Sequence, residues 1–312
     1  MTGGRSALTR YAWLSIAASI VIICLKTVAY WLTDSVGLLS DALESVVNLV
    51  AASVVLIVLT IAARPPDEDH PYGHDKAEYF SSGVEGGMIF IAALGIAIAA
   101  VERLIHPRPL EQVGAGLSIS LVASIINFAV ARVLLKASRE HDSITLEADA
   151  RHLMTDVWTS IGVLISVGAV VFTGWLWLDP VIAIAVAINI TWTAVGLVRR
   201  SVLGLMDTAL PEAELDVIHK VLEPSGRAGI RYHALRTRRA GARRFVSMHL
   251  LVPGAWSVQR GHDLAEDIEA SICEKLPNTT ITVHLEPLED PRSWADTALH
   301  PVQAPNVGAP EA

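Results

Sequence analysis

The stretch 144–172, ITLEADARHLMTDVWTSIGVLISVGAVVF, decides the fold of this chain and contains its most informative side chains. It is long and apolar enough to cross the roughly 30 Å hydrocarbon core of a membrane as a helix. His152 and Asp156 nevertheless stand inside it, spaced i, i+4, so that both lie on one helix face, one turn apart. Ionisable groups at that depth cost several kcal/mol and mark the pathway of a substrate or an ion.

A second apolar stretch, 36–63, repeats this pattern with Glu44 and Asn48. We expect the two pairs to face each other and to form a site for a small divalent cation, which suggests a carrier. Asp41 lies one turn before Glu44 and is a candidate supporting residue. Two plainer interpretations stay open: Asn48 as a hydrogen-bonding residue between helices, and Asp41 as a capping or packing residue.

The composition is that of a membrane protein. Of the 312 residues, 52% are hydrophobic and 18% charged, and the mean hydropathy is +0.45. Apolar stretches must satisfy their backbone polar groups internally, and none alternates like a barrel strand, so helices are expected. The formal net charge of -8 gives no indication of a nucleic-acid partner. The six predicted membrane spans are 11–32, 36–63, 79–105, 113–135, 144–172 and 177–203.

The distribution of Lys and Arg predicts the orientation of these spans. One set of loops is basic, and the opposite loops hold only Arg103 and Arg108. We therefore expect a multi-pass protein of the inner (cytoplasmic) membrane with both termini in the cytoplasm, and a first span that is retained rather than cleaved. The residues of the basic set are Arg5, Arg10, Arg64, Lys76, Lys136, Arg139, Arg199 and Arg200.

The character of the chain changes after the sixth span. Residues 1–206 are expected to form the transmembrane domain, 207–290 a cytoplasmic domain and 291–312 a disordered tail rich in Pro and Ala. Cys24 and Cys273 are the only cysteines, so neither a disulfide framework nor a cysteine metal cluster is expected.

Periodicity within the cytoplasmic part predicts a small α+β domain of the order αββαβ, with both helices on one face of the sheet. The first helix begins at Leu210-Pro211-Glu212, with Pro in the first turn and acids just inside, and ends at about residue 222. The other predicted elements are strands 231–238 and 245–252, a helix 258–276 and a strand 280–285.

Two further groups of side chains have the chemistry of metal ligands. The connection between the second and third spans contains Asp67, His70 and His74, which predicts a metal site in a short cytoplasmic turn, with a merely solvated acidic loop as the alternative. The cytoplasmic domain contains His233, His249, His262 and His284, and Glu286 points to the same side of its strand as His284. Scattered surface histidines are the alternative there. Glu85, Asn127 and Asn189 lie deep in other spans, where hydration of a cavity or helix packing is expected rather than ligation.

Three motifs resemble one known family. They are SVGLLSDALES (35–45), HPYGHDKAE (70–78) and ADARHLMTDV (148–157), in that order. Together they are similar to the cation diffusion facilitators, which are proton-coupled metal exporters, and the match extends from the first span to about Pro287. The resemblance implies a homodimer in the lipid bilayer, with six transmembrane helices per protomer and a cytoplasmic domain similar to copper metallochaperones.

The resemblance also implies three metal positions and one ion pair. The implied ion pair is Lys76 with Asp207, near the dimer interface. The transport site would be Glu44, Asn48, His152 and Asp156; the loop site Asp67, His70 and His74; and the cytoplasmic site, where two domains meet, His233, His249, His262, His284 and Glu286.

These residues lead to a functional expectation. The chain is not expected to be an enzyme but a divalent cation:proton antiporter that exports Zn²⁺ or Fe²⁺, or else Mn²⁺, Co²⁺ or Cd²⁺, with Zn²⁺ or another divalent metal also as a structural ion. Oxygen and imidazole ligands without thiolate argue against Cu(I). Asn48 departs from the commoner carboxylate and removes one negative charge from the site. The alternative is a membrane-anchored metal sensor or scaffold that dimerises without transport.

Overall fold

The structure is a computed structural model that describes residues 8–33, 36–106, 115–227 and 229–294. The chain divides into two compact units, Met1–Leu205 and Met206–Ala312. Each unit has its own hydrophobic core.

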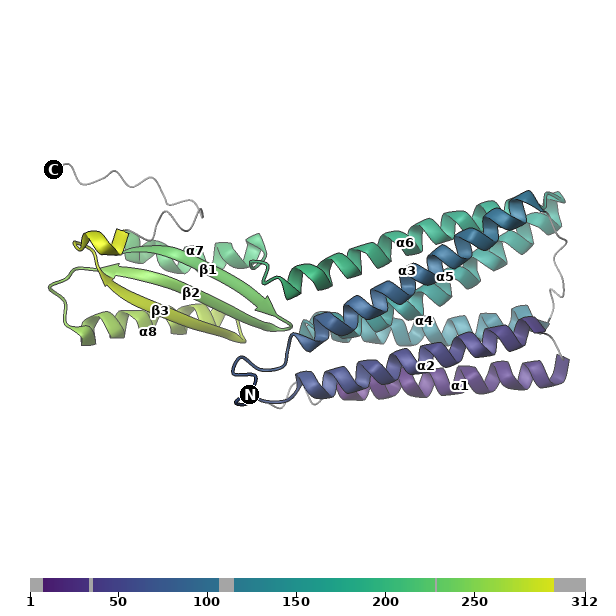
Figure 1. Ribbon diagram of the computed structural model, residues 1–312, viewed down its shortest axis with the longest axis horizontal. Helices are drawn as coiled ribbons and strands as arrows, with labels where there is room; N and C mark the ends of the chain where they lie inside the picture. The colour runs from purple at the N-terminus through teal and green to yellow at the C-terminus, as the bar shows by residue number, and fades with distance from the viewer. Residues whose placement is uncertain (1–7, 34–35, 107–114, 228, 295–312) are drawn as a thin grey trace. The chain divides into compact units, whose positions relative to one another are not determined.

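Six long helices make up the described part of the first unit, and the prediction of six helical spans is confirmed (Figure 1). Four of them, α1, α3, α4 and α6, contain described segments long and apolar enough to cross a membrane. Helix α4 extends six residues beyond the predicted end at residue 135. An α-helix does not stop where apolar residues stop, and basic side chains suit its last turn. The helices are α1 (Thr9–Thr33), α2 (Val36–Ala62), α3 (Ala77–Ile105), α4 (Ala115–His141), α5 (Ile144–Thr173) and α6 (Leu178–Leu205).

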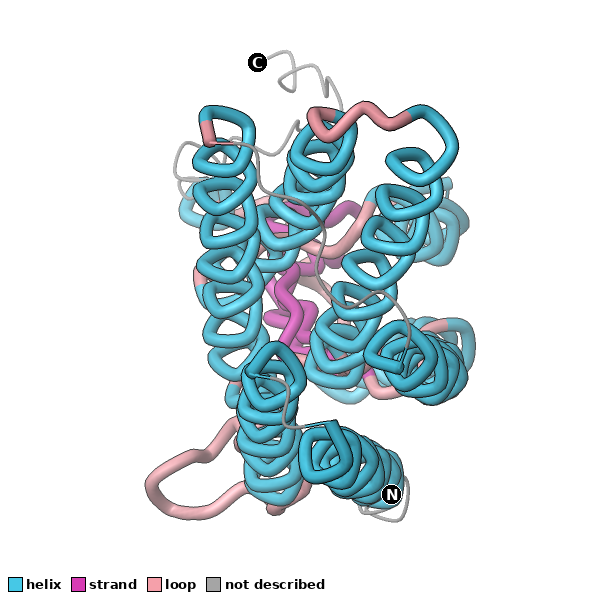
Figure 2. The backbone as a smooth tube through the Cα atoms, turned by 90° about the vertical axis from the view of Figure 1, so that its right-hand side faces the viewer, coloured by secondary structure: helices cyan, strands magenta, loops and turns pink. Residues whose placement is uncertain are grey.

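Helix α5 packs in both hydrophobic clusters of this unit. Leu153 belongs to the cluster shared with α1, α2 and α4, whereas Ala148 belongs to the cluster shared with α3 and α6. Helices α3 and α6 lie side by side along their length (Figure 1, Figure 2). Their close approach depends on small residues: a Cβ atom at Gly86 would lie 2.8 Å from Cγ2 of Val198 and 3.2 Å from its backbone nitrogen.

A buried carboxylate joins the beginning of α3 to the beginning of α5. The hydroxyl of Ser143 donates to Oε2 of Glu78 at 2.5 Å, and the hydroxyl of Thr145 donates to the backbone carbonyl of Glu78 at 3.2 Å. Ser143 is also the N-cap of α5, where its side chain accepts from the backbone N–H of Leu146. The start of α5 is thereby fixed on α3.

The second unit is a three-stranded sheet with two helices, and the predicted order αββαβ is confirmed. The antiparallel strands β1 and β2 are joined at Gly241, whose φ is +55°, while β2 and β3 run parallel and are connected by α8. The elements are α7 (Glu212–Arg227), β1 (Arg231–Ala240), β2 (Arg243–Val252), α8 (Val258–Lys275) and β3 (Thr279–Pro287). Helix α7 continues past Pro224, beyond its predicted end, because a proline so close to the C-terminus interrupts little of the helix.

Both helices cover one face of the sheet, as expected. Val246, Met248 and Leu250 of β2 alternate toward this face and pack in one core with Ile218 of α7 and Ile272 of α8. The residues between them, His249 included, point to the opposite face.

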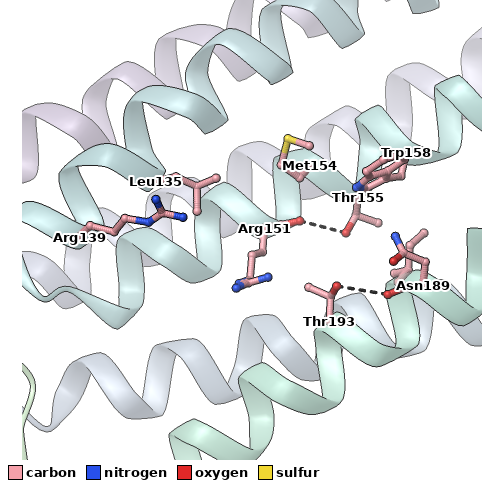
Figure 3. A pocket seen from close by; sticks show the side chains of 9 residues that line it. Leu135, Arg139, Arg151, Met154, Thr155, Trp158, Asn189 and Thr193 are labelled. Atoms are coloured by element: carbon pink, nitrogen blue, oxygen red, sulfur yellow. Dashed lines mark hydrogen bonds between the residues drawn. The ribbon is translucent and has the colours of Figure 1, made fainter. Parts of the chain in front are cut away.

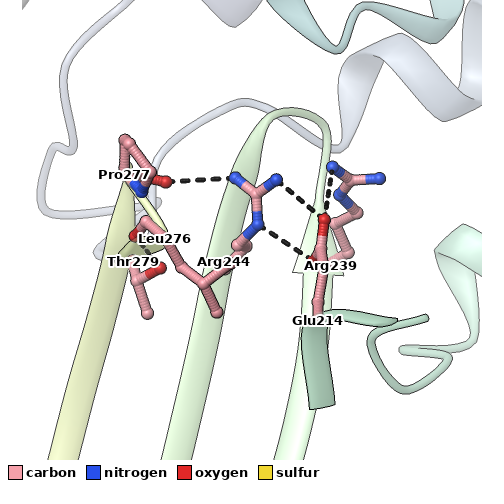
Figure 4. A network of polar contacts seen from close by, with 6 residues as sticks. All are labelled: Glu214, Arg239, Arg244, Leu276, Pro277 and Thr279. Atoms are coloured by element: carbon pink, nitrogen blue, oxygen red, sulfur yellow. Dashed lines mark hydrogen bonds and ion pairs between the residues drawn. The ribbon is translucent and has the colours of Figure 1, made fainter. Parts of the chain in front are cut away.

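An arginine network ties α7 to the sheet (Figure 4). Arg244 donates to Glu214 through Nε at 3.0 Å and Nη2 at 2.8 Å, and through Nη1 to the carbonyl of Pro277 at 3.0 Å. Burial raises the pKa of Glu214, but the hydrogen bond from Arg244 and the charges of Arg239 and Arg244 outweigh it, so this pKa lies below its ordinary value.

The chain after β3 differs in part from the predicted disordered tail. Residues 291–294 form a 3-10 turn in which the Trp294 indole donates to the carbonyl of Leu288 at 3.0 Å and Ser293 donates to the carbonyl of Pro287 at 2.8 Å. The rest of the predicted tail, 295–312, lies outside the described residues.

Candidate metal centres

Helices α2 and α5 bring three of the four predicted transport-site side chains together. Nδ2 of Asn48 donates to Oδ2 of Asp156 at 2.6 Å, and Nε2 of His152 lies 2.9 Å from Oδ1 of Asn48. A metal ion bound by Nε2 of His152, Oδ1 of Asn48 and Oδ2 of Asp156 would have to displace both contacts. The side chains of Glu44 and Asp41, on α2, lie outside the described part of the structure.

Asn127 of α4 joins this site, although the sequence suggested only packing or hydration for it. Its Nδ2 donates to the same Asp156 oxygen at 3.2 Å, and its side chain is buried. Two amide donors on one carboxylate oxygen suit an ionised Asp156. The only signal in the sequence was an amide deep in an apolar span.

A second pair of acids, Glu85 and Asp149, is buried in the same unit. Asp149 lies one turn before His152 on α5 and accepts a hydrogen bond from Ser15 at 3.2 Å. Glu85 of α3 interacts electrostatically with Asp149, and among the described residues neither of its carboxylate oxygens has a hydrogen-bond partner. Such an environment is unusual for a purely structural acid.

The loop between α2 and α3 gathers the three side chains predicted for it. Asp67 Oδ1 lies 3.2 Å from Nδ1 of His70, and Asp67 Oδ2 lies 3.3 Å from Nε2 of His74. Gly73, with a φ of +84°, permits the turn that brings them together. The backbone N–H of His70 donates to Asp67 at 2.7 Å and holds the pKa of that carboxyl below its ordinary value. One carboxylate and two imidazoles fit a divalent transition metal.

Strand register aligns three histidines across the sheet of the second unit. His249 on β2 is the partner of His233 on β1 and of His284 on β3. A bulge after His233, where Ala234 has a φ of +50°, lets the next residues return to the core while His233 keeps to the open face. Adjacent imidazole rings have centroids 5.0 Å apart.

Glu286 completes this cluster, which we call the sheet cluster: His233, His249, His284 and Glu286. Its carboxylate oxygens lie 2.8 Å from Nε2 of His233, 3.2 Å from Nδ1 of His249 and 3.6 Å from Nε2 of His284. Oxygen and imidazole atoms that converge in this way fit a divalent transition metal.

Two other predicted contacts stand apart. His262 lies on α8, on the helix-covered side of the sheet, with its Nε2 3.9 Å from Glu266, so one chain does not bring it to the sheet cluster. Asp207 pairs with Arg238 at 3.3 Å within the second unit, and its predicted pairing with Lys76 stays a prediction.

A helical membrane unit with a polar site inside it, together with a second unit in which imidazole and carboxylate groups converge, is typical of membrane proteins that handle divalent metal cations. Residues 12–206 match the "Cation efflux transmembrane domain" and residues 210–288 match the "Cation efflux protein, cytoplasmic domain". The chain belongs to the cation efflux family, the cation diffusion facilitators, and the resemblance carried by the three motifs is confirmed.

Two similar transporters match almost the whole chain, and one solved structure matches a quarter of it. An uncharacterized transporter of Synechocystis sp. is 52% identical over 295 residues, which are 95% of each chain. The cation-efflux pump FieF of Salmonella arizonae is 29% identical over 287 residues, 92% of this chain and 94% of that one. A solved structure of the putative zinc transporter CzrB (Zn form) is 35% identical, with a TM-score of 0.24, and the match covers 25% of this chain and 90% of that one.

Proposed function

We propose that this protein is an antiporter that exports Zn²⁺ or Fe²⁺ from the cytoplasm in exchange for protons. It acts as a homodimer in the inner membrane with both termini cytoplasmic. The observation that carries the proposal is the contact of Asn48, His152 and Asp156 inside the helical unit. Metal export by this family and the names of its relatives support it.

Ligand chemistry supplies the coupling between the two ions. His152 must be neutral and Asp156 ionised to hold a divalent cation, so protons compete with metal for the same lone pairs. A proton that arrives from outside displaces the cation and returns inward on the same groups. Metal bound by the loop site and by the sheet cluster has a structural role in this proposal.

Flux measurements in proteoliposomes test the proposal. Asp156→Ala should abolish uptake of Zn²⁺ and Fe²⁺ into these proteoliposomes by protein inserted with its proposed cytoplasmic side outward. The accompanying proton movement should also be lost, while the protein stays folded. Glu140→Ala is the matched control, because it removes an exposed carboxylate at the end of α4 and should leave flux unchanged. Metal binding without flux in the wild-type protein would instead favour the membrane-anchored sensor or scaffold.

A further inference from the structure

A cavity of about 240 Å³ lies between α4, α5 and α6. Figure 3 shows the side chains of Arg139 and Arg151 toward one end, with Trp158 and Asn189 toward the other. Arg139 lies near the C-terminus of α4 and Arg151 near the N-terminus of α5, so the two guanidinium groups belong to the same end of the helices.

The cavity lies on a different face of α5 from the transport site. Arg151, Met154, Thr155 and Trp158 follow the spacing i, i+3, i+4, i+7, which is a single helix face. His152 and Asp156 are each offset by one residue from this series, and therefore by about 100° around the helix. The cavity is separate from the proposed metal site, although one helix serves both.

The positive charge of this cavity opposes the binding of a metal cation. Arg151 and Arg200 both bind Glu147, at 2.8 Å and 2.7 Å, and Arg139 makes no hydrogen bond or ion pair with any residue that the structure describes. Arg139 and Arg151 are the only charged residues in the lining, and both are cationic. Guanidinium groups are donors without acceptor atoms, and their planar forks match phosphate oxygens.

Apolar side chains make up much of the rest of the lining. They are Leu135, Met154, Ile190 and Trp158, which is 44% exposed. A ligand that satisfies both the guanidinium groups and these apolar side chains carries an anionic head group and a hydrocarbon chain. Basic pockets between transmembrane helices have this chemistry where they hold acidic phospholipids.

We propose that this cavity binds one anionic phospholipid, with its phosphate on Arg139 and Arg151 and an acyl chain against Trp158. The site does not depend on transport, and a protein that failed every flux test would still contain it.

The test uses the delipidated full-length protein in detergent and counts bound lipid by native mass spectrometry. The probes are phosphatidylglycerol, phosphatidylcholine and inorganic phosphate. Wild-type protein should retain phosphatidylglycerol in preference to phosphatidylcholine. Arg139→Gln should weaken phosphatidylglycerol binding about tenfold, the effect of losing one charge-assisted hydrogen bond. Arg139→Lys keeps the charge without the planar fork, so its affinity for phosphatidylglycerol should lie between those of wild type and Arg139→Gln.

Arg199→Gln is the matched control. It removes an exposed charge near the C-terminus of α6, and Arg199 does not line the cavity. Equal losses in Arg139→Gln and Arg199→Gln would mean diffuse surface charge and would overturn the proposal. Trp158→Ala should weaken phosphatidylglycerol binding as well. Full displacement of the lipid by millimolar inorganic phosphate would make the cavity a free-anion site, which also contradicts the proposal. Size-exclusion elution and a melting curve confirm that each variant is folded.

Discussion

Asn48 and Asp156, 108 residues apart in the sequence, meet in a hydrogen bond of 2.6 Å from the amide of α2 to the carboxylate of α5. The same amide contacts His152 through its oxygen, at 2.9 Å. One neutral side chain thus connects both described ionisable groups of the transport site.

Asn48→Asp should change the ion preference among Zn²⁺, Fe²⁺ and Mn²⁺ and steepen the pH dependence of transport. The new carboxylate adds like-charge repulsion to the empty site but an anionic ligand to the loaded one, so more protons must leave when metal enters. Flux of each ion across an external pH series measures both effects. Asn278→Asp, which adds an exposed carboxylate in the second unit, is the control. Wild-type selectivity and pH profile in Asn48→Asp would remove Asn48 from the ligands and favour Asp41.

Loss of the sheet cluster should weaken metal binding to the second unit but leave some transport. In His233→Ala with His284→Ala, two imidazoles are lost from around Glu286, and the affinity measured by calorimetry should fall by at least about tenfold. Dimerisation of the isolated unit should weaken in parallel. His219→Ala removes a histidine of α7 that contacts the hydroxyl of Tyr232 on β1, and it should leave metal binding unchanged. Unaltered binding in the double variant would dismiss the cluster as a metal site.

Gly86→Ala should destabilise the packing of α3 on α6. The added Cβ would meet both the side chain and the backbone of Val198, and overpacking of this kind costs about 1–3 kcal/mol. Gly87→Ala shares the gain in helix propensity, but its Cβ would meet nothing within 4 Å. The melting temperature of the purified protein should fall in the first variant alone. Equal melting temperatures would show that α6 gives way at little cost.

The Glu214–Arg244 pair should make the stability of the second unit depend on pH. The folded-state pKa of Glu214 is depressed, so its contribution is present above the ordinary pKa of about 4.3 and is lost as pH falls through the folded pKa. At pH 7, Glu214→Gln should lower the free energy of unfolding of residues 206–294 by about 1–3 kcal/mol.

Urea unfolding across a pH series measures this difference, which should close below about pH 4 as wild type loses the charge. Glu212→Gln, which removes an exposed carboxylate two residues earlier on α7, should match wild type at every pH. If the free energy of unfolding of Glu214→Gln stays below that of wild type at low pH, the effect of the substitution comes from packing instead of charge.

Spacing within one helix could be predicted from the sequence, but contacts between elements could not. The i, i+4 pairs placed His152 and Asp156 on one face, whereas nothing in the sequence indicated that Asn127 of α4 would share Asp156 with Asn48. Strand alternation put Glu286 beside His284. The alignment of His233 with both depended on a bulge, which is set by tertiary packing.

Glu78 gives α5 a mechanical role. This carboxylate stands four residues after His74 of the loop site, and it holds Ser143 and Thr145 at the first turn of α5. A displacement of the loop that moved Glu78 would therefore reach α5 through buried hydrogen bonds. Further along α5, His152 lies on one face of the helix and the arginine-lined cavity on another. A cation in the loop, a cation in the membrane and a lipid in the cavity would therefore all act on the position of the same helix, α5.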